Sequence, residues 1–308
     1  MVVSEMIKIQ NGRVLNLSGS SECKFQGGEY ESIRVSGSSD LTGNYTSNEI
    51  IITGSCDIEG DLKAGTLRIS GSSDIVGDIE VDSLHRTGSC DISGNVRANI
   101  IKSSGSGDIT GYVEVDRLQI SGSGDIIGNV NADYISISGS SNIDGNVVCN
   151  FIELANSSDI NGSLSAKTIN LKGNCDINGE VTGEELTISG NVTLNESCEV
   201  AYFKSYGAVE ITRHLYAEEV DIRIGGDCEI GEIGAGKVTI KRVEIKDMIK
   251  KNGIFSKIIN NFKITEKFLR ADVIEGDDIF LENTIARIVR GKNIVIGVNC
   301  EIENIEYI

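Results

Sequence analysis

The same pattern of apolar and polar positions recurs along the chain, with successive copies starting at Thr53, Ser70 and Thr87. Eleven such copies form a 17-residue repeat that runs in register from Ser36 to Ile222, and one copy that is one residue longer precedes them, starting at Ser18. Within a copy, apolar residues favour positions 6, 10, 12, 15 and 17, and Gly recurs at positions 2 and 8. A spacing of two is typical of β-strands, and the wider step from position 12 to position 15 indicates a corner.

Each copy is therefore predicted to form one turn of a solenoid. Gly suits the tight bends at which a turn changes direction, and successive turns would stack at the strand spacing of about 4.8 Å. Every turn then buries its apolar edge against its neighbours. Leucine-rich repeats need longer units and helical repeats need a 3.6-residue period, so we expect an all-β protein, a single-stack β-solenoid.

The pattern is interrupted once. The segment Lys241–Arg270 carries nine Lys or Arg residues against three acidic residues, and its apolar residues share one helical face. We expect a main stack over residues 1–240, a short basic helical insertion over 241–270, and further coils over 271–308. The apolar face would lie on an anionic membrane surface or pack on the solenoid. The candidate contact residues are Lys250, Lys251, Ile254, Phe255, Lys257, Ile258, Ile259 and Phe262.

The composition and charge of the chain narrow the range of possible functions. The chain has no Pro and no Trp, and its formal net charge is −18. Absence of Pro fits strands that are paired on both sides, because Pro cannot donate to a β-ladder. The acidity argues against nucleic-acid binding, which relies on Lys and Arg. The first residues lack the features of a signal peptide, so we expect a soluble intracellular protein.

The eight Cys form no C-x-x-C pair. Most fall at positions with inward parity, which predicts small buried hydrophobic side chains rather than disulfides or a metal site. These residues are Cys23, Cys56, Cys90, Cys149, Cys175, Cys198 and Cys228.

Position 5 of the repeat is almost always Asp, and stacking would align these side chains into one series, the acidic ladder. A divalent cation column could relieve the repulsion between its carboxylates, with Asp57, Asp74, Asp91, Asp108 and Asp125 as metal ligands. Alternatively, each side chain accepts hydrogen bonds from N–H groups beside the Ser-Gly bend. The ladder consists of Asp40, Asp57, Asp74, Asp91, Asp108, Asp125, Asn142, Asp159 and Asp176.

The sequence contains few residues or motifs that would indicate an enzyme. The only histidines, His85 and His214, lie in different copies and lack partners at the spacing of a triad or metal site. No phosphate-binding loop motif is present, and hexapeptide-repeat acyltransferases would need an apolar residue every six positions and a longer coil. We expect no enzyme activity and no cofactor.

The tandem S-G-S-[SG]-D-I-x-G-[DN]-[IV] turns and the stretch from Gly276 to Tyr307 resemble bactofilin-type polymer-forming cytoskeletal proteins of Gram-positive bacteria. The resemblance implies a right-handed parallel β-helix and nucleotide-independent filaments joined end to end. It also implies roles in cell shape, motility or the positioning of partners, often beside the membrane, and no catalytic residues. This chain differs in having more turns, no Pro-containing tails and the basic insertion.

These observations predict a scaffold that polymerises with itself. It would lie in the cytoplasm, either free or bound peripherally to the inner face of the cell membrane. Apolar residues at the terminal turns are the candidate joints: Val2, Val3 and Ile7 at one end, and Ile302, Ile305, Tyr307 and Ile308 at the other. The alternative is a monomeric binding module that presents the acidic ladder to a cation or a basic partner protein.

Overall fold

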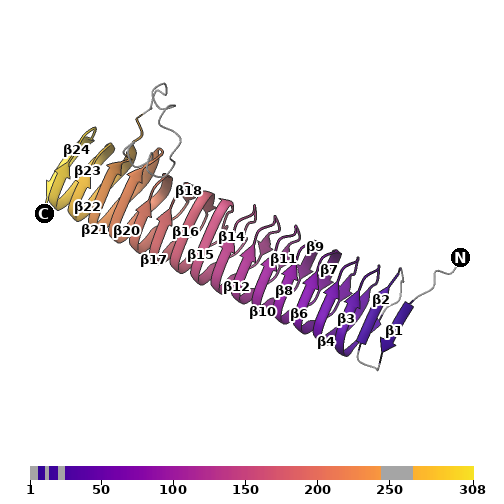
Figure 1. Cartoon of the computed structure of the whole chain (residues 1–308). Coiled ribbons are helices and arrows are strands. Elements are labelled where there is room, and N and C mark those ends of the chain that lie inside the picture. Colours follow the sequence, from indigo (N-terminus) through magenta and orange to yellow (C-terminus); the bar gives the residue numbers. More distant parts are fainter. Residues whose placement is uncertain (1–5, 11–13, 20–24, 244–265) are drawn as a thin grey trace, which may run out of the picture. The chain divides into compact units, whose positions relative to one another are not determined.

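The computed structural model describes residues 6–10, 14–19, 25–243 and 266–308. These residues contain 24 β-strands and no helix. They belong to two compact units, Met1–Gly162 (unit 1) and Ser163–Ile308 (unit 2). In each unit the strands lie side by side as successive rungs (Figure 1). The prediction of an all-β solenoid is confirmed.

Apart from β1, unit 1 is built from parallel strands, and from β4 onward facing residues of adjacent turns are separated by 17 residues in sequence. Leu67 of β6 pairs with Leu84 of β8, and Leu84 pairs with Ile101 of β10. The strands of unit 1 are β1 Met6–Gln10, β2 Val14–Ser18, β3 Phe25–Val35, β4 Leu41–Ile52, β5 Ile58–Glu59, β6 Leu62–Ile69, β7 Ser72–Val76, β8 Ile79–Arg86, β9 Ser89–Ser93, β10 Val96–Ser103, β11 Ile109–Thr110, β12 Val113–Ile120, β13 Ile126–Ile127, β14 Val130–Ile137 and β15 Val147–Ser157.

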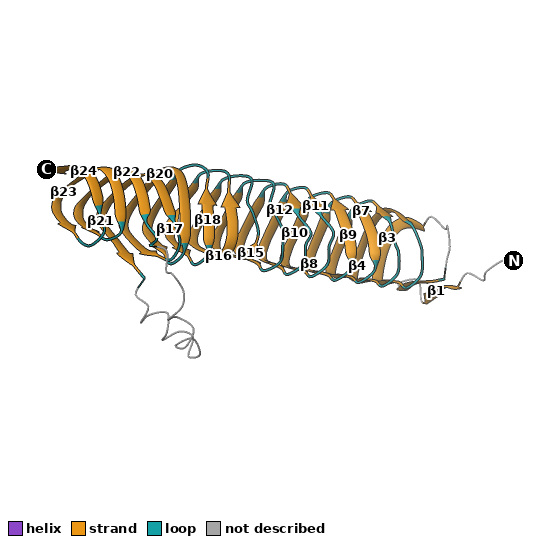
Figure 2. Cartoon of the chain, turned by 90° about the horizontal axis from the view of Figure 1, so that it is seen from above, coloured by secondary structure: helices purple, strands orange, loops and turns teal. Residues whose placement is uncertain are grey.

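Each turn of unit 1 has three faces. In repeat positions, β7 covers 3 to 7 and forms the first face. β8 covers 10 to 17 and changes its inward parity after position 12, so positions 10 to 13 form the second face and positions 14 to 17 the third. Side chains at positions 4, 6, 10, 12, 15 and 17 are buried, as in the turn of Ser73, Ile75, Ile79, Val81 and Leu84. Loops align along the edges between the strands (Figure 2). The buried positions agree with the predicted apolar positions and include position 4, for which the predicted burial of Cys56 and Cys90 is confirmed.

Two glycines show why the bends need this residue. Gly71, at position 2, is so close to the preceding turn that a Cβ would lie 1.7 Å from the carbonyl oxygen of Gly54. Gly60, at position 8, has a φ of 144°, which L-residues with a side chain rarely adopt. At these two positions the stacking of the turns therefore requires Gly.

Unit 2 begins with the same period and then departs from it. Val181 pairs with Cys198 and Cys198 with Leu215, a separation of 17 residues as in unit 1. Leu269 pairs with Thr284, and the separation shortens to 15 residues. The strands of unit 2 are β16 Leu164–Ile177, β17 Val181–Ile188, β18 Asn191–Leu194, β19 Cys198–Ser205, β20 Ala208–Ile224, β21 Cys228–Arg242, β22 Leu269–Leu281, β23 Thr284–Ile296 and β24 Glu301–Tyr307.

The interruption of the repeat lies between β21 and β22. β21 continues to Arg242 and β22 begins at Leu269, so the first two and the last two residues of the expected insertion are strand residues. The predicted helix, and all eight candidate membrane or partner contacts on it, fall within residues 244–265, outside the described residues. β21 pairs directly with β22 through Ile233 and Ile274, so the coils resume after the segment, as expected.

Candidate functional site

The last strands of unit 2 expose side chains that continue buried columns. Ile274 and Val289 are fully buried, and the next residue in their column, Ile305 of β24, is 40% exposed. Ala286 is buried and pairs with Ile302, which is half-buried. Apolar interior is therefore open to solvent at β24.

A second pair of columns ends in the same way one strand earlier. Ile279 and Leu281 are buried in β22, and their partners in β23 are the half-buried Ile294 and Ile296, which is 38% exposed. Ile294 and Ile296 were not among the predicted joint residues, because both lie before the final strand. With the four predicted residues they form the terminal face: Ile294, Ile296, Ile302, Ile305, Tyr307 and Ile308.

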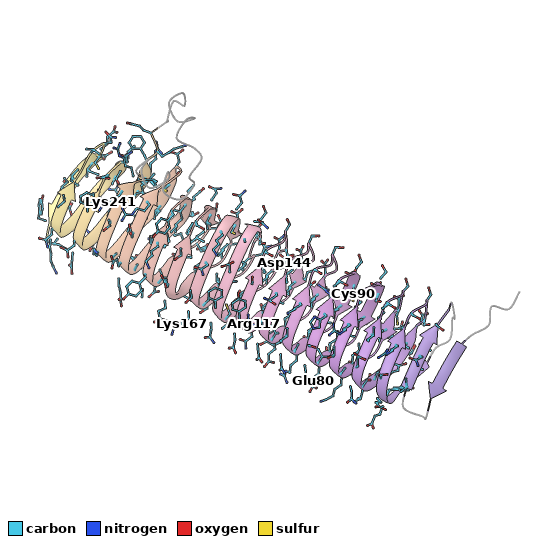
Figure 3. All side chains as sticks on the ribbon, viewed as in Figure 1. Glu80, Cys90, Arg117, Asp144, Lys167 and Lys241 are labelled. Atoms are coloured by element: carbon cyan, nitrogen blue, oxygen red, sulfur yellow. The ribbon has the colours of Figure 1, made fainter. Side chains whose placement is uncertain are left out.

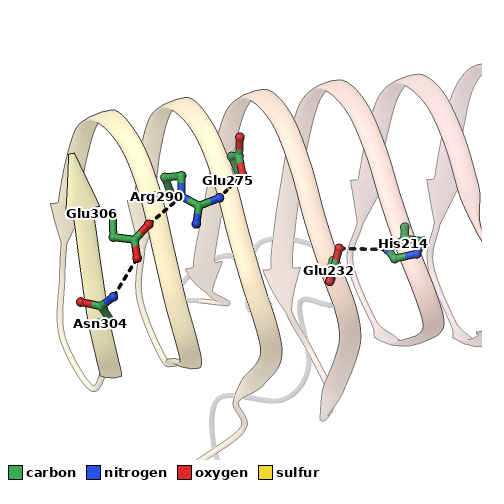
Figure 4. A network of polar contacts seen from close by, with 6 residues as sticks. All are labelled: His214, Glu232, Glu275, Arg290, Asn304 and Glu306. Carbon is green, nitrogen blue, oxygen red and sulfur yellow. Dashed lines mark hydrogen bonds and ion pairs between the residues drawn. The ribbon is translucent and has the colours of Figure 1, made fainter. Parts of the chain in front are cut away.

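The edge strand β24 is held in place by ion pairs across three strands. Nη1 of Arg290 in β23 lies 3.0 Å from Oε2 of Glu275 in β22, and its Nε lies 2.7 Å from Oε2 of Glu306 in β24 (Figure 4). Asn304 donates from Nδ2 to Oε1 of Glu306 at 2.9 Å. These contacts link β24 to β22 and β23.

The first strand of unit 1 departs from the parallel arrangement. β1 pairs antiparallel with β2, with Ile7 opposite Leu17, while β2 pairs parallel with β3. Val2 and Val3 lie outside the described residues, and no side chain of β1 is described. One edge of β2 is thus already occupied by a strand of the same chain.

The acidic ladder makes hydrogen bonds between turns of unit 1, in an unbroken series from Asp91 to Asp159. Five of its side chains, those of Asp57, Asp91, Asp108, Asp125 and Asn142, accept a hydrogen bond from the backbone N–H of the ladder residue in the next turn. Asp108 donates to Oδ1 of Asp91 at 2.9 Å, Asp125 to Asp108 at 2.8 Å, and Asn142 to Asp125 at 2.7 Å. Asp74 donates likewise to Asp57 at 3.3 Å. The side chains thereby satisfy backbone donors of the following turn.

These hydrogen bonds differ from the predicted ones in their donors. The donors belong to the equivalent residue one turn later, and not to the local Ser-Gly bend. Among the described residues, no group of three or more His, Cys, Asp or Glu side chains is placed to hold a metal ion. Cation binding by the ladder remains a prediction.

A second ladder, at position 9, was not recognised from the sequence. Asp61 donates its backbone N–H to Oδ1 of Asn44 at 2.9 Å, Asp78 to Asp61 at 3.0 Å, and Asn95 to Asp78 at 2.7 Å. Tyr112 donates to Asn95 at 3.0 Å. The signal for this ladder was the Asn or Asp that follows the position-8 Gly in most turns.

The cysteines are interior residues, as expected. Cys56, Cys90, Cys149, Cys175, Cys198 and Cys228 are buried and free, and Cys300 is half-buried. Burial raises the pKa of the Cys56, Cys90, Cys149 and Cys198 thiols to about 12. These thiols remain protonated and unreactive at neutral pH. Cys23 lies outside the described residues.

The two histidines lie on the surface, in different units. His85 is half-buried on the third face of unit 1, and the nearby Arg68 and Lys102 add to burial in lowering its pKa. Nδ1 of His214 lies 3.1 Å from Oε2 of Glu232 in unit 2 (Figure 4). The described residues include no helix long and apolar enough to cross a membrane.

Comparison with known proteins agrees with this architecture. The family model described as Bactofilin, polymer-forming cytoskeletal, matches residues 19–114 and 104–182. The uncharacterized protein YhbF of Bacillus subtilis (strain 168) is 37% identical over 94 residues, which cover 30% of this chain and 34% of YhbF. YhbE of the same organism, also uncharacterized, is 54% identical over 39 residues, or 13% of this chain and 16% of YhbE.

The matched part thus spans about a third of YhbF and about a sixth of YhbE. No solved structure matches the chain. The two family matches together cover residues 19–182, which is more than half of the 308 residues and consists of the stacked repeat turns. The chain therefore belongs to the bactofilin family, a structural family of polymer-forming cytoskeletal proteins.

Proposed function

We propose that this bactofilin polymerises end to end without nucleotide, and that the terminal face of unit 2 is one of its joints. The observation that carries the proposal is the continuation of buried apolar columns into exposed side chains at β23 and β24. A second copy would cover these side chains as the preceding turns cover one another.

Two interactions would stabilise such a joint. The outer edge of β24 pairs with no strand among the described residues, so its backbone groups are available for strand addition. The most exposed apolar side chains are Ile308, at 65%, and Tyr307, at 71%. Burying the exposed part of each large side chain would contribute roughly 1 kcal/mol.

The partner surface on the next copy remains part of the proposal. Val2, Val3 and Ile7 are the candidates, and β1 would take part because it lies on the edge of β2. The described residues offer no catalytic arrangement that would compete with a structural role.

Negative-stain electron microscopy of the purified chain, without nucleotide, tests the joint. We expect filaments from the parent and single particles from a variant with Ile305→Lys and Ile308→Lys. A matched control is Ile127→Lys with Val148→Lys, because these exposed apolar residues, at 44% and 54%, lie on the sides of unit 1. The control should still form filaments.

Single particles from the parent at every concentration would overturn the joint. The monomeric binding module that presents the acidic ladder would then be the better explanation. Loss of filaments in the control as well would show that added positive charge, and not the terminal face, is responsible.

We further propose a cytoplasmic location with peripheral contact at the inner face of the cell membrane. The support is the basic amphipathic sequence that includes Phe255 and Ile259. Sedimentation with anionic liposomes tests it, because Phe255→Glu with Ile259→Glu should abolish pelleting. Equal pelleting of the parent and this variant would remove the membrane contact from the proposal.

A further inference from the structure

The three faces of unit 1 differ in the charges along their central columns. The first face carries the acidic ladder. The second face carries exposed ion pairs, Lys63 with Glu80 at 2.7 Å and Arg97 with Glu114 at 2.6 Å. The third face carries Arg68, His85 and Lys102 on three adjacent strands, which we call the basic strip.

Among the described residues, neither Arg68 nor Lys102 forms an ion pair, although both are exposed. Arg117 extends the positive charge on the neighbouring column, where its guanidinium lies 4.3 Å from the ring centroid of Tyr134. In a chain of net charge −18, these exposed cations offer a surface to an anionic partner.

We propose that the basic strip docks side by side onto the acidic ladder of a second copy. Both series are built on the same stacked turns, so their charges recur at the same rung spacing of about 4.8 Å. Arg68 and Lys102 are two rungs apart, as are Asp57 and Asp91. Two copies with aligned axes can therefore match several charges at once, in either relative direction.

The two surfaces point in different directions on one copy, so each copy can use both. Arg117 and Asp144, which flank the two central columns, lie on opposite edges of unit 1 (Figure 3). Asp57, Asp74 and Asp91 are exposed. In Asp57 and Asp91, Oδ1 accepts the backbone N–H of the next turn, so the second carboxylate oxygen remains for a partner. A single contact of this kind is weak, because exposed ion pairs are screened.

The docking therefore rests on the proposed polymerisation. A filament repeats the contact many times, so many weak ion pairs together can hold two filaments side by side. It would join filaments laterally into bundles. Bundles held by exposed charges should separate at about 1 M salt, where the Debye length is about 3 Å, while filaments joined by apolar burial should persist.

Bundles and filaments can be measured separately, by low-speed and high-speed sedimentation with electron microscopy of both pellets. Arg68→Gln with Lys102→Gln should lose bundles and keep filaments. The matched control, Lys63→Gln with Arg97→Gln, makes the same charge change on the second face and should keep both. Asp74→Asn with Asp91→Asn removes two carboxylate charges and should also lose bundles. The fold should be kept, because Asn142 already accepts the same kind of hydrogen bond in the ladder.

The outcomes separate this proposal from the end joint. Parent filaments that never bundle at low salt, or bundles that survive Arg68→Gln with Lys102→Gln, overturn the lateral docking and leave the end joint intact. A parent that forms no filaments overturns the end joint and the docking that rests on it. If Arg68→Gln with Lys102→Gln bundles normally but no longer pellets with anionic liposomes, the basic strip binds lipid instead of a second copy.

Discussion

The guanidinium of Arg86 is buried in the core of unit 1 and donates to the hydroxyl of Ser103, one turn later in the same column. Nε and Nη2 lie 3.2 and 3.1 Å from Oγ of Ser103, and Arg86 is only 1% exposed. Nη1 donates to the carbonyl oxygens of Cys90 at 2.7 Å and Asp108 at 3.3 Å. No carboxylate pairs with this buried charge in the described structure.

The Arg86–Ser103 pair interrupts a column of isoleucines, because Ile52, Ile69 and Ile120 hold the same position in neighbouring turns. Burial lowers the pKa of Arg86, because removing a charge from water is costly. The polar pair fits only one stacking register, and neighbouring turns are otherwise nearly alike. We interpret it as a register marker that prevents turns from pairing out of order.

Replacing Ser103 with Ile should be strongly destabilising. The change removes the acceptor of two charged hydrogen bonds and forces a larger side chain against Arg86, at a cost of about 3 to 5 kcal/mol. Denaturant unfolding would measure the loss. Arg86→Ile with Ser103→Ile should be more stable than Ser103→Ile alone, and a double variant that is equally unstable would contradict the pairing.

The acidic ladder should tolerate amide but not alkyl replacement. Asp91→Asn keeps an oxygen acceptor for the N–H of Asp108 and removes repulsion, so thermal unfolding should be unchanged or slightly raised. Asp91→Ala leaves that donor without its partner and should cost about 1 kcal/mol. If added Ca²⁺ stabilises the parent and not Asp91→Asn, the cation column becomes the better explanation.

Stability should fall as the pH rises from about 9 towards 12. Unfolded thiols lose their protons near pH 8.5 to 9, whereas burial raises the pKa of Cys198 in the folded chain to about 12. Between these values the unfolded state binds fewer protons and is favoured. The urea midpoint of unfolding should therefore drop less between pH 8 and pH 10.5 in Cys198→Val than in the parent. An identical drop would exclude this thiol as a cause.

Arg290→Gln should loosen the edge strand β24. The substitution removes the ion pairs to Glu275 and Glu306 that connect β24 with β22 and β23. Hydrogen exchange of residues 301–307 should become faster while exchange in β21 stays the same. Arg287 lies on the same strand without an ion pair among the described residues, so Arg287→Gln is the control. Equal acceleration in both variants would assign the effect to lost positive charge.

The sequence by itself determined the turn, its length and which positions face inward. Strand side chains alternate with a period of two, so a repeat of fixed length with one change of parity specifies strands, corners and interior. The burial of Ile75, Ile79 and Leu84 in one turn follows from that local rule. The same rule placed the cysteines inside and identified Ile302 and Ile305 as continuing the interior at β24.

Only the tertiary structure decided which residues meet across turns. The Arg86–Ser103 pair, the second ladder through Asn44 and Asp61, and the antiparallel β1 all depend on neighbours outside the repeat unit. The exposure of Ile296 depends on how the shorter last turns stack on β22. Parity is a property of the local backbone, but contacts between turns require the register and the bends of the whole stack.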